Sequence, residues 1–330
     1  MKKIREYLEG TKIPPMVVLD MTNACNLRCI HCPLTEMIEK PGYQAAHLSW
    51  EYFSKIVDEL TEIGEPVLLR MVGNGEPMIH PEFMKMAEYA CQSENITVNL
   101  TTNGLMMTDK KIKAILEMGM DLIDVSIDAM TKPVYEEVRS GGKYETFCAK
   151  MFNLLDQRSK KKAKTRLMVS FISQKENRHE ADAFRTFWEP LVDYVMIRNL
   201  HSALGQVKTE ESATYNKAKS IERYPCPHLW KRLTVDFHGN IKFCAHDWTD
   251  EADLILGNIG DVSLAEVWTG SHLGGLREKH ACNTIDVGHV CGPCTDWASS
   301  PWEYGYERLV DRVVHEESKL LPVLPLLGSS

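Results

Sequence analysis

MTNACNLRCIHCP (residues 21–33) follows an apolar run near the N-terminus and holds three of the ten cysteines of the chain. Cys25, Cys29 and Cys32 are spaced C-x3-C-x2-C, so their thiols can converge on one metal centre. Thiolates are the usual ligands of iron–sulfur clusters, and a [4Fe–4S] cluster takes about four of them. Three ligands leave one iron open, which is typical of a catalytic metal centre. A zinc site, or three unrelated thiols, is the alternative.

The chain around this motif predicts a parallel β-sheet. Six runs rich in Val, Ile and Leu alternate only weakly between apolar and polar residues, which is typical of strands covered on both faces. They span residues 16–23, 67–73, 96–103, 122–129, 166–173 and 194–201.

Helical patterns separate these runs. Ser49 is placed to begin a helix that Gly64 ends, and Thr108 to begin another. Further helical spacing occurs at residues 81–93, 143–162 and 179–191. Strands that alternate with helices at this distance predict an α/β fold, a partial (β/α)6 TIM-like barrel over residues 14–205. Ligands of such folds bind at the carboxyl ends of the strands.

Composition narrows the class of protein. The 330 residues carry 38 Lys and Arg against 46 Asp and Glu, a net charge of −8, which argues against a general nucleic-acid binder. The N-terminus lacks the apolar segment of a secretory signal, and no apolar run reaches about 18 residues, so we expect no membrane span. We therefore expect a cytoplasmic protein, because clustered cysteines in a reducing compartment serve metal or redox chemistry rather than disulfides.

The pattern changes after residue 205. The polar residues 206–223 predict a linker or a connecting helix, and residues 224–300, which contain five of the ten cysteines, predict a small metal-stapled domain. VDFHGNIKFC (residues 235–244) predicts a β-hairpin that turns at residues 238–240. Residues 301–330 predict an amphipathic helix and a loosely ordered tail.

Four of these later cysteines form a second candidate metal site. The hairpin carries Cys244, Cys226 precedes it, and Cys291 and Cys294 form a C-x2-C pair. Four thiolates make a closed site. Spacing alone allows either tetrahedral zinc or a [4Fe–4S] cluster there.

The CNLRCIHC motif after the first strand resembles that of the radical S-adenosylmethionine (radical SAM) enzymes. This resemblance implies that Cys25, Cys29 and Cys32 bind a [4Fe–4S] cluster whose fourth iron is chelated by S-adenosylmethionine. It implies reductive cleavage of that cofactor to a 5′-deoxyadenosyl radical, which abstracts hydrogen from a substrate. His31 falls where the family carries an aromatic residue near the adenine.

Motifs at later strand ends are similar to those of the same family. Residues 73–77 (GNGEP) look like its GGEP motif, with Asn74 in place of the second glycine. Glycines there let the backbone approach a ligand closely, and Glu76 can accept a hydrogen bond from an ammonium group. The positions that the resemblance assigns to S-adenosylmethionine binding are His31, Gly73, Gly75, Glu76, Thr102, Asn103, Ser126 and Arg139.

The C-terminal third resembles the SPASM/twitch extension of radical SAM enzymes. The features that carry this resemblance are C-x12-G-x4-C, GNIGDVSLAEVW, and a C-x2-C pair followed by Asp296 and Trp297. No cysteine follows Cys294, so the chain resembles the shorter type. The resemblance implies one auxiliary [4Fe–4S] cluster, held by Cys226, Cys244, Cys291 and Cys294.

A closed auxiliary cluster is suited to electron transfer, so we expect a two-electron dehydrogenation of an alcohol, a sugar, an aminocyclitol or a peptide side chain. The residues that we expect to assist catalysis, mainly by deprotonating the substrate radical, are His246, Asp247, Arg198 and His201. The alternative reaction is epimerisation, with Cys282 as hydrogen-atom donor. A structural zinc protein without enzymatic activity is the third alternative.

Three cysteines lie outside the two candidate metal sites. Cys91 and Cys148 lie in helical patterns and are expected to be core thiols.

The expected partners are a small-molecule or peptide substrate and an electron donor such as a flavodoxin or ferredoxin, with no nucleic acid and no membrane. Substrate identity, the role of Cys282 and the oligomeric state are not determined by the sequence.

Overall fold

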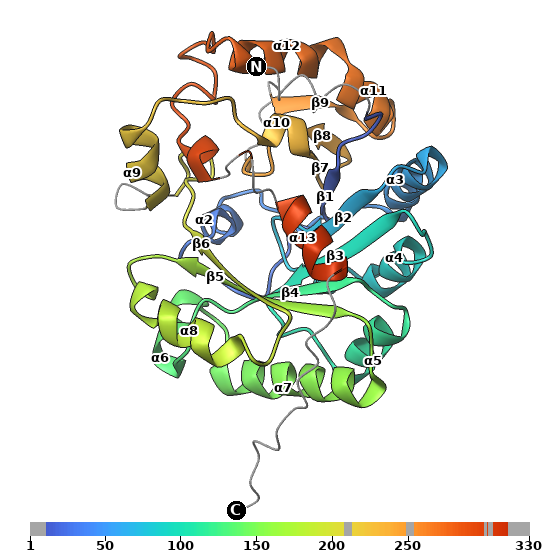
Figure 1. Ribbon diagram of the computed structural model, residues 1–330, viewed down its shortest axis with the longest axis vertical. Coiled ribbons are helices and arrows are strands. Elements are labelled where there is room, and N and C mark those ends of the chain that lie inside the picture. Colours follow the sequence, from blue (N-terminus) through green and yellow to red (C-terminus); the bar gives the residue numbers. More distant parts are fainter. Residues whose placement is uncertain (1–10, 208–212, 249–253, 300–301, 303–305, 316–330) are drawn as a thin grey trace, which may run out of the picture.

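A computed structural model describes residues 11–207, 213–248, 254–299, 302 and 306–315. These residues form one nine-stranded sheet with helices packed along it (Figure 1). Within this described part of the chain, no helix is long and apolar enough to cross a membrane.

The first six strands form the expected parallel sheet of an incomplete (β/α)6 barrel. Neighbouring strands pair in parallel from β1 to β6. No pairing closes β6 onto β1 among the described residues, so the barrel is open. The strands are β1 (Met16–Asp20), β2 (Val67–Val72), β3 (Ile96–Thr102), β4 (Leu122–Ser126), β5 (Arg166–Ser173) and β6 (Tyr194–Asn199).

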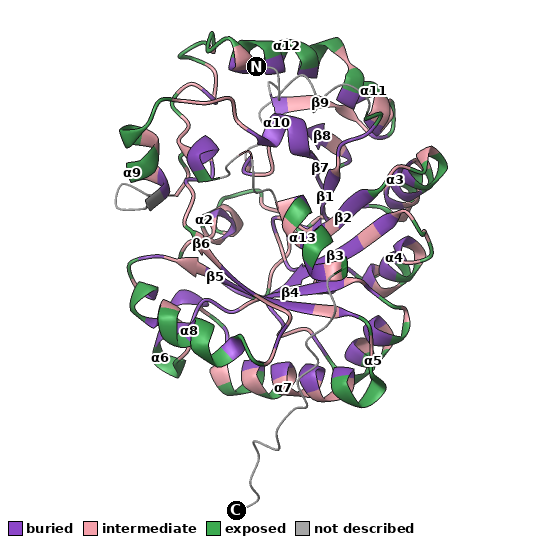
Figure 2. Ribbon diagram, in the orientation of Figure 1, coloured by how far each residue is buried: buried purple, intermediate pink, exposed green. Residues whose placement is uncertain are grey.

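Helices cover the convex face of this sheet. Their apolar side chains and alternate strand residues form the main core, so the strands are buried on both faces (Figure 2). These helices are α3 (Trp50–Ile63), α4 (Phe83–Ala90), α5 (Asp109–Glu117), α6 (Lys132–Val138), α7 (Tyr144–Lys161) and α8 (Ala181–Trp188), while the short helix α2 (Pro33–Ile38) directly follows the three-cysteine loop.

The helix ends follow the local chemistry of the sequence. The Ser49 side chain accepts a hydrogen bond from the backbone N–H of Tyr52 and begins α3. Gly64 ends that helix with φ of 73°, a conformation that glycine adopts without strain. Thr108 begins α5 in the same way, by accepting from Lys111 N–H.

The cysteine-rich segment extends the same sheet. Strand β7 (Leu233–Val235) pairs in parallel with β1, and β8 (Asn240–Lys242) and β9 (Ile255–Asn258) continue it in antiparallel fashion. The hairpin between β7 and β8 was expected, but its turn begins earlier, at Asp236, because this carboxylate accepts from the backbone N–H groups of His238 and Asn240. Helices α10 (His228–Lys231), α11 (Leu264–Thr269) and α12 (Ser271–Ala281) accompany these strands.

Helix α13 (Tyr306–His315) packs against the other face of the barrel sheet (Figure 1). Val310 and Val313 contact a second, smaller apolar cluster that includes Met16, Leu122 and Met168 from three strands. The helix expected in residues 301–330 therefore fills the bore of the open barrel. The tail expected after it lies outside the described residues.

The segment predicted as a linker or a connecting helix contains a helix. Helix α9 (Ala213–Ser220) occupies its second half, while residues 208–212 lie outside the described part of the chain. The two predicted domains share one sheet, so the sheet does not divide them from each other. Their boundaries remain predictions.

Candidate functional site

The three-cysteine loop begins after β1, at the carboxyl edge of the sheet. Backbone bonds hold it in place, because Arg28 N–H donates to Ser140 O and Ile30 N–H to Val138 O. Burial raises the pKa of Cys25 to about 11 and that of Cys32 to about 12. Burial also raises the pKa of Cys29. The buried thiols stay protonated until a metal replaces their protons.

The GNGEP loop after β2 packs directly on the cysteine loop. Glu76 N–H donates to Ala24 O at 2.8 Å. A Cβ at Gly75 would lie 2.3 Å from Ala24 O, so no larger residue fits there without a shift. Gly73 has φ of 127°, and a Cβ there would lie 2.4 Å from the Cα of Asp20. Both glycines are thus required by close approach of the backbone to β1 and the loop after it.

Glu76 joins the ends of two strands. Its side chain is 2% exposed, and burial raises its pKa. Its Oε1 accepts from Thr102 Oγ1 at 2.6 Å and from Met78 N–H, and its Oε2 accepts from Asn103 N–H at 2.8 Å. Three protein donors therefore already bind the carboxylate that we expected to meet an ammonium group. That contact stays a prediction.

His31 and Arg139 meet at one carboxylate. Arg139 forms an ion pair of 2.5 Å with Asp128, and His31 Nε2 lies 3.7 Å from the same oxygen. Burial lowers the pKa of His31 to about 4, so its imidazole is neutral. The positive charge of Arg139 opposes the rise that burial causes in the pKa of Cys29. The structure thus gathers these predicted cofactor-binding residues beside the three-cysteine loop.

A cavity of about 890 Å³ opens at the carboxyl ends of the strands and continues to the cysteine-rich segment. Gly73, Ser126, Arg198, His201 and His246, all chosen from the sequence, line it. The structure adds wall residues that the sequence interpretation missed, namely Asp20, Arg70, Arg232 and Tyr306.

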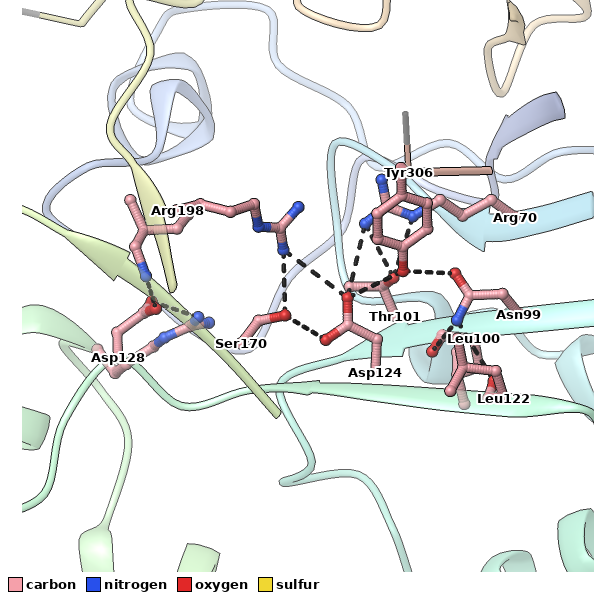
Figure 3. A network of polar contacts seen from close by, with 12 residues as sticks. Arg70, Asn99, Leu100, Thr101, Leu122, Asp124, Asp128, Ser170, Arg198 and Tyr306 are labelled. Carbon is pink, nitrogen blue, oxygen red and sulfur yellow. Dashed lines mark hydrogen bonds and ion pairs between the residues drawn. The ribbon is translucent and has the colours of Figure 1, made fainter. Parts of the chain in front are cut away.

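A buried carboxylate organises the floor of this cavity (Figure 3). Asp124 is fully buried and accepts hydrogen bonds from Ser170 Oγ and from the Tyr306 hydroxyl. Arg70 and Arg198 lie 3.8 and 3.7 Å from it. Two guanidinium groups thus share one carboxylate. Arg198, expected to assist deprotonation, is held as a charged hydrogen-bond donor.

Asp20, the last residue of β1, is an unpaired carboxyl group in the cavity wall. It is 5% exposed, and no described residue donates a hydrogen bond to its side chain or forms an ion pair with it. Burial raises its pKa to about 8, the nearby carboxylates of Asp236 and Asp247 add to this effect, and Lys242 opposes it. A carboxyl group with this pKa exchanges protons near neutral pH.

Histidines separate the cavity from the second cysteine site. The rings of His201 and His246 stack with centroids 3.9 Å apart, and His228 meets His246 edge-on at 5.0 Å. His246 Nδ1 lies 3.1 Å from an oxygen of Asp296, whose other oxygen accepts from Ser202 N–H. Burial lowers the pKa of all three histidines.

Cys226, Cys244, Cys291 and Cys294 line one buried void. Burial raises the pKa of Cys226, Cys244 and Cys294 to about 12, and it also raises that of Cys291. Arg223 holds the C-x2-C loop by donating to the carbonyls of Cys291 and Gly292, at 2.6 and 2.8 Å. The four thiols thus meet although they come from three separate segments.

The four cysteines fit a metal centre with four thiolate ligands. Tetrahedral zinc and a [4Fe–4S] cluster both take such a ligand set. Cys226, Cys244, Cys291 and Cys294 line one buried void, where either group would supply the positive charge that buried thiolates need.

Two residues chosen from the sequence lie away from the cavity. Asp247 is buried in an ion pair of 3.2 Å with Lys242 and is not among the residues that line the cavity. Cys282 is exposed at the end of α12 and is not among the cavity-lining residues either. Cys91 and Cys148 pack against the main core, as expected of helix thiols.

Comparison with known proteins identifies the family. A model of the radical SAM superfamily matches residues 19–183, half of the chain, and a model of the SPASM iron-sulfur cluster-binding domain matches residues 226–295. The chain therefore belongs to the radical SAM superfamily. It is a member with a SPASM domain C-terminal to the radical SAM domain. Membership implies S-adenosylmethionine, a [4Fe–4S] cluster and auxiliary iron–sulfur binding.

Individual relatives match this chain only in part. The tungsten-containing aldehyde ferredoxin oxidoreductase cofactor-modifying protein of Pyrococcus furiosus is 31% identical over 112 residues, 34% of this chain and 30% of that protein. The chain spans about a third of the length of the curated relatives it matches.

Solved structures show the same fold. BtrN in complex with AdoMet and 2-DOIA matches with a TM-score of 0.57 at 14% identity, over 86% of this chain and 93% of BtrN. Streptococcus suis SuiB bound to precursor peptide SuiA matches with a TM-score of 0.60 at 15% identity, over 94% and 75%. At such identities the likeness establishes the fold alone.

Proposed function

We propose that this protein is a radical SAM dehydrogenase that removes two electrons from its substrate. Cys25, Cys29 and Cys32 would hold a [4Fe–4S] cluster that supplies the electron for reductive cleavage of S-adenosylmethionine, and the resulting radical chemistry would remove a hydrogen atom from a substrate carbon. The substrate would then lose one proton to the protein, and Cys226, Cys244, Cys291 and Cys294 would hold an auxiliary cluster able to accept the second electron. The substrate thus leaves with two hydrogens fewer.

One observation carries this proposal. His228 and His246 line both the large cavity and the void between the four cysteines. A substrate in the cavity would therefore be separated from an auxiliary cluster by a single layer of side chains. Such a short separation suits electron transfer, whereas a purely structural metal site has no need to adjoin the cavity.

We assign Asp20 as the base that accepts the proton lost by the substrate radical. It lies in the cavity wall with no partner among the described residues, so its carboxylate is available to a substrate hydroxyl, amine or thiol. Burial and the nearby carboxylates of Asp236 and Asp247 raise its pKa to about 8, and the positive charge of Lys242 opposes this rise. A base with a pKa near the working pH is the most effective one. Arg70 and Arg198, beside Asp124, would orient the substrate.

Two substrate classes fit the site. The cavity of about 890 Å³ has the size of a small-molecule site, and α13 lines part of it through Tyr306. The structures with the same fold include one with the small molecule 2-DOIA and one with a precursor peptide. We propose a small alcohol, sugar or aminocyclitol first and a peptide side chain second. A flavodoxin or ferredoxin would supply the electron for cofactor cleavage.

The test starts with the metal content of anaerobically purified protein. Two clusters predict about eight irons per chain and absorbance near 400 nm. Dithionite and S-adenosylmethionine should then yield 5′-deoxyadenosine, and the product should be two mass units lighter than the substrate. Colourless, zinc-containing protein would refute the enzyme proposal, and a product of unchanged mass would refute dehydrogenation. No feature of the structure favours epimerisation through Cys282, which is exposed outside the cavity.

A further inference from the structure

His280 borders the void between the four cysteines. It lies near the end of α12, is 3% exposed and lines this void together with Cys226, Cys244, Cys291 and Cys294. Its Nδ1 accepts from the backbone N–H of Cys226 at 3.4 Å. A ring nitrogen that accepts carries no proton, so the proton of this neutral imidazole sits on Nε2.

The Nε2–H group has no partner in the described protein. Its nitrogen is buried and makes no hydrogen bond there. Buried donors in native proteins are nearly always satisfied, so an acceptor bound between the four neighbouring cysteines would explain this one. Sulfur atoms of an iron–sulfur cluster are acceptors of the required kind.

We propose that His280 donates a hydrogen bond from Nε2 to a sulfur of the auxiliary [4Fe–4S] cluster and thereby raises its reduction potential. This inference rests on the proposed assignment of that cluster to the four cysteines. Reduction adds negative charge to the cluster, and a donor stabilises the reduced form more than the oxidised form. His280 is thus a positioning residue that makes the cluster a better electron acceptor for the substrate radical.

The test compares three variants of the reconstituted holoenzyme by redox titration followed by electron paramagnetic resonance. His280→Phe keeps a planar ring but removes the donor, so the potential of the auxiliary cluster should fall while that of the three-cysteine cluster stays constant. His280→Gln retains an N–H at a similar reach and should restore most of the potential. His272→Phe, on the exposed side of the same helix, should change neither potential.

A spectroscopic readout covers the case in which His280→Phe does not bind iron fully. Protein labelled with ¹⁵N-histidine should show a hyperfine coupling between the reduced auxiliary cluster and a histidine nitrogen, and His280→Gln should lose it. An unchanged auxiliary potential in His280→Phe, or an unchanged coupling in His280→Gln, would overturn the role of His280 alone. A protein with only about four irons and one cluster signal would overturn the auxiliary assignment itself, and this inference with it.

Discussion

The two cysteine sites of this protein are built in opposite ways. Cys25, Cys29 and Cys32 belong to one loop after β1, and the protein offers three thiols there. Cys226, Cys244 and the C-x2-C pair come from three segments that converge only after β7 and β8 have joined the sheet at β1. An open site needs room for a ligand, whereas a closed one needs only to be near the cavity. Removal of a thiol should therefore have different consequences for the reaction at the two sites.

Loss of a thiol from the open site should have the largest effect. Cys29→Ala leaves two ligands in the loop, too few to hold the cluster, so cofactor cleavage should be abolished altogether. The measurement is 5′-deoxyadenosine formed with dithionite. Cys148→Ala, in α7, is the matched control and should keep normal cleavage. Cleavage by Cys29→Ala at the wild-type rate would show that the cluster lies elsewhere.

Loss of a thiol from the closed site should separate the two halves of the reaction. Cys294→Ala should lower the iron content from about eight to about four per chain. Cleavage of S-adenosylmethionine should persist, but the product two mass units lighter should disappear because its electron has no acceptor. The exposed Cys282→Ala should change neither result. Normal product from four-iron protein would contradict the electron-acceptor role.

This difference between one loop and three converging segments explains how much of each site the sequence predicts. The three-cysteine loop and its strand lie within a few residues, so the motif alone indicated an open cluster, and the six barrel strands and the helix capped by Ser49 were predicted at nearly their observed bounds. The pairing of β7 with β1 is a long-range contact that no local pattern encodes. Only this pairing brings the void of the four cysteines up to the cavity.

The residues of the cavity wall were also only partly predictable from the sequence. Arg70 interrupts an apolar strand, and Asp124 lies within another. A charged residue inside a buried strand is unusual and could have indicated a functional position from the sequence alone. Tyr306 had no comparable signal, since its hydroxyl reaches Asn99 and Asp124 across the barrel bore. Cys282 and Asp247 stood in suggestive sequence positions, yet their exposure and ion pairing depend on tertiary structure.

Asp20 connects the two sites, so its variant should affect coupling and not cofactor cleavage. With a pKa of about 8, roughly a tenth of Asp20 is ionised at pH 7, and product formation should rise with pH through pH 8 and level off at about pH 9. Asp20→Asn cannot accept a proton, so we expect product formation to fall about 10²–10⁴-fold and this rise to vanish. The rate of 5′-deoxyadenosine formation should stay near normal.

The pH–rate profile decides between Asp20 and the histidines. A rise through pH 8 that persists in Asp20→Asn would assign the proton to another group of the cavity. A profile that becomes flat, with cofactor cleavage unchanged, would confirm Asp20 as the proton acceptor. The asparagine side chain has nearly the same size, so altered packing against Gly73 does not complicate the comparison.

The smallest expected effect concerns the backbone under the open site. Gly75→Ala would place a methyl group 2.3 Å from Ala24 O, so the cysteine loop must shift, at a cost of about 1–3 kcal/mol in stability. Gly274→Ala, in α12 beside the closed site, meets nothing within 4 Å and should stabilise the protein by about 0.4–1 kcal/mol. Anaerobic unfolding curves and iron content measure both. Because only Gly75 supports a cysteine loop, only its variant should also lose iron, and equal iron in both variants would mean that the open site tolerates displacement of its loop.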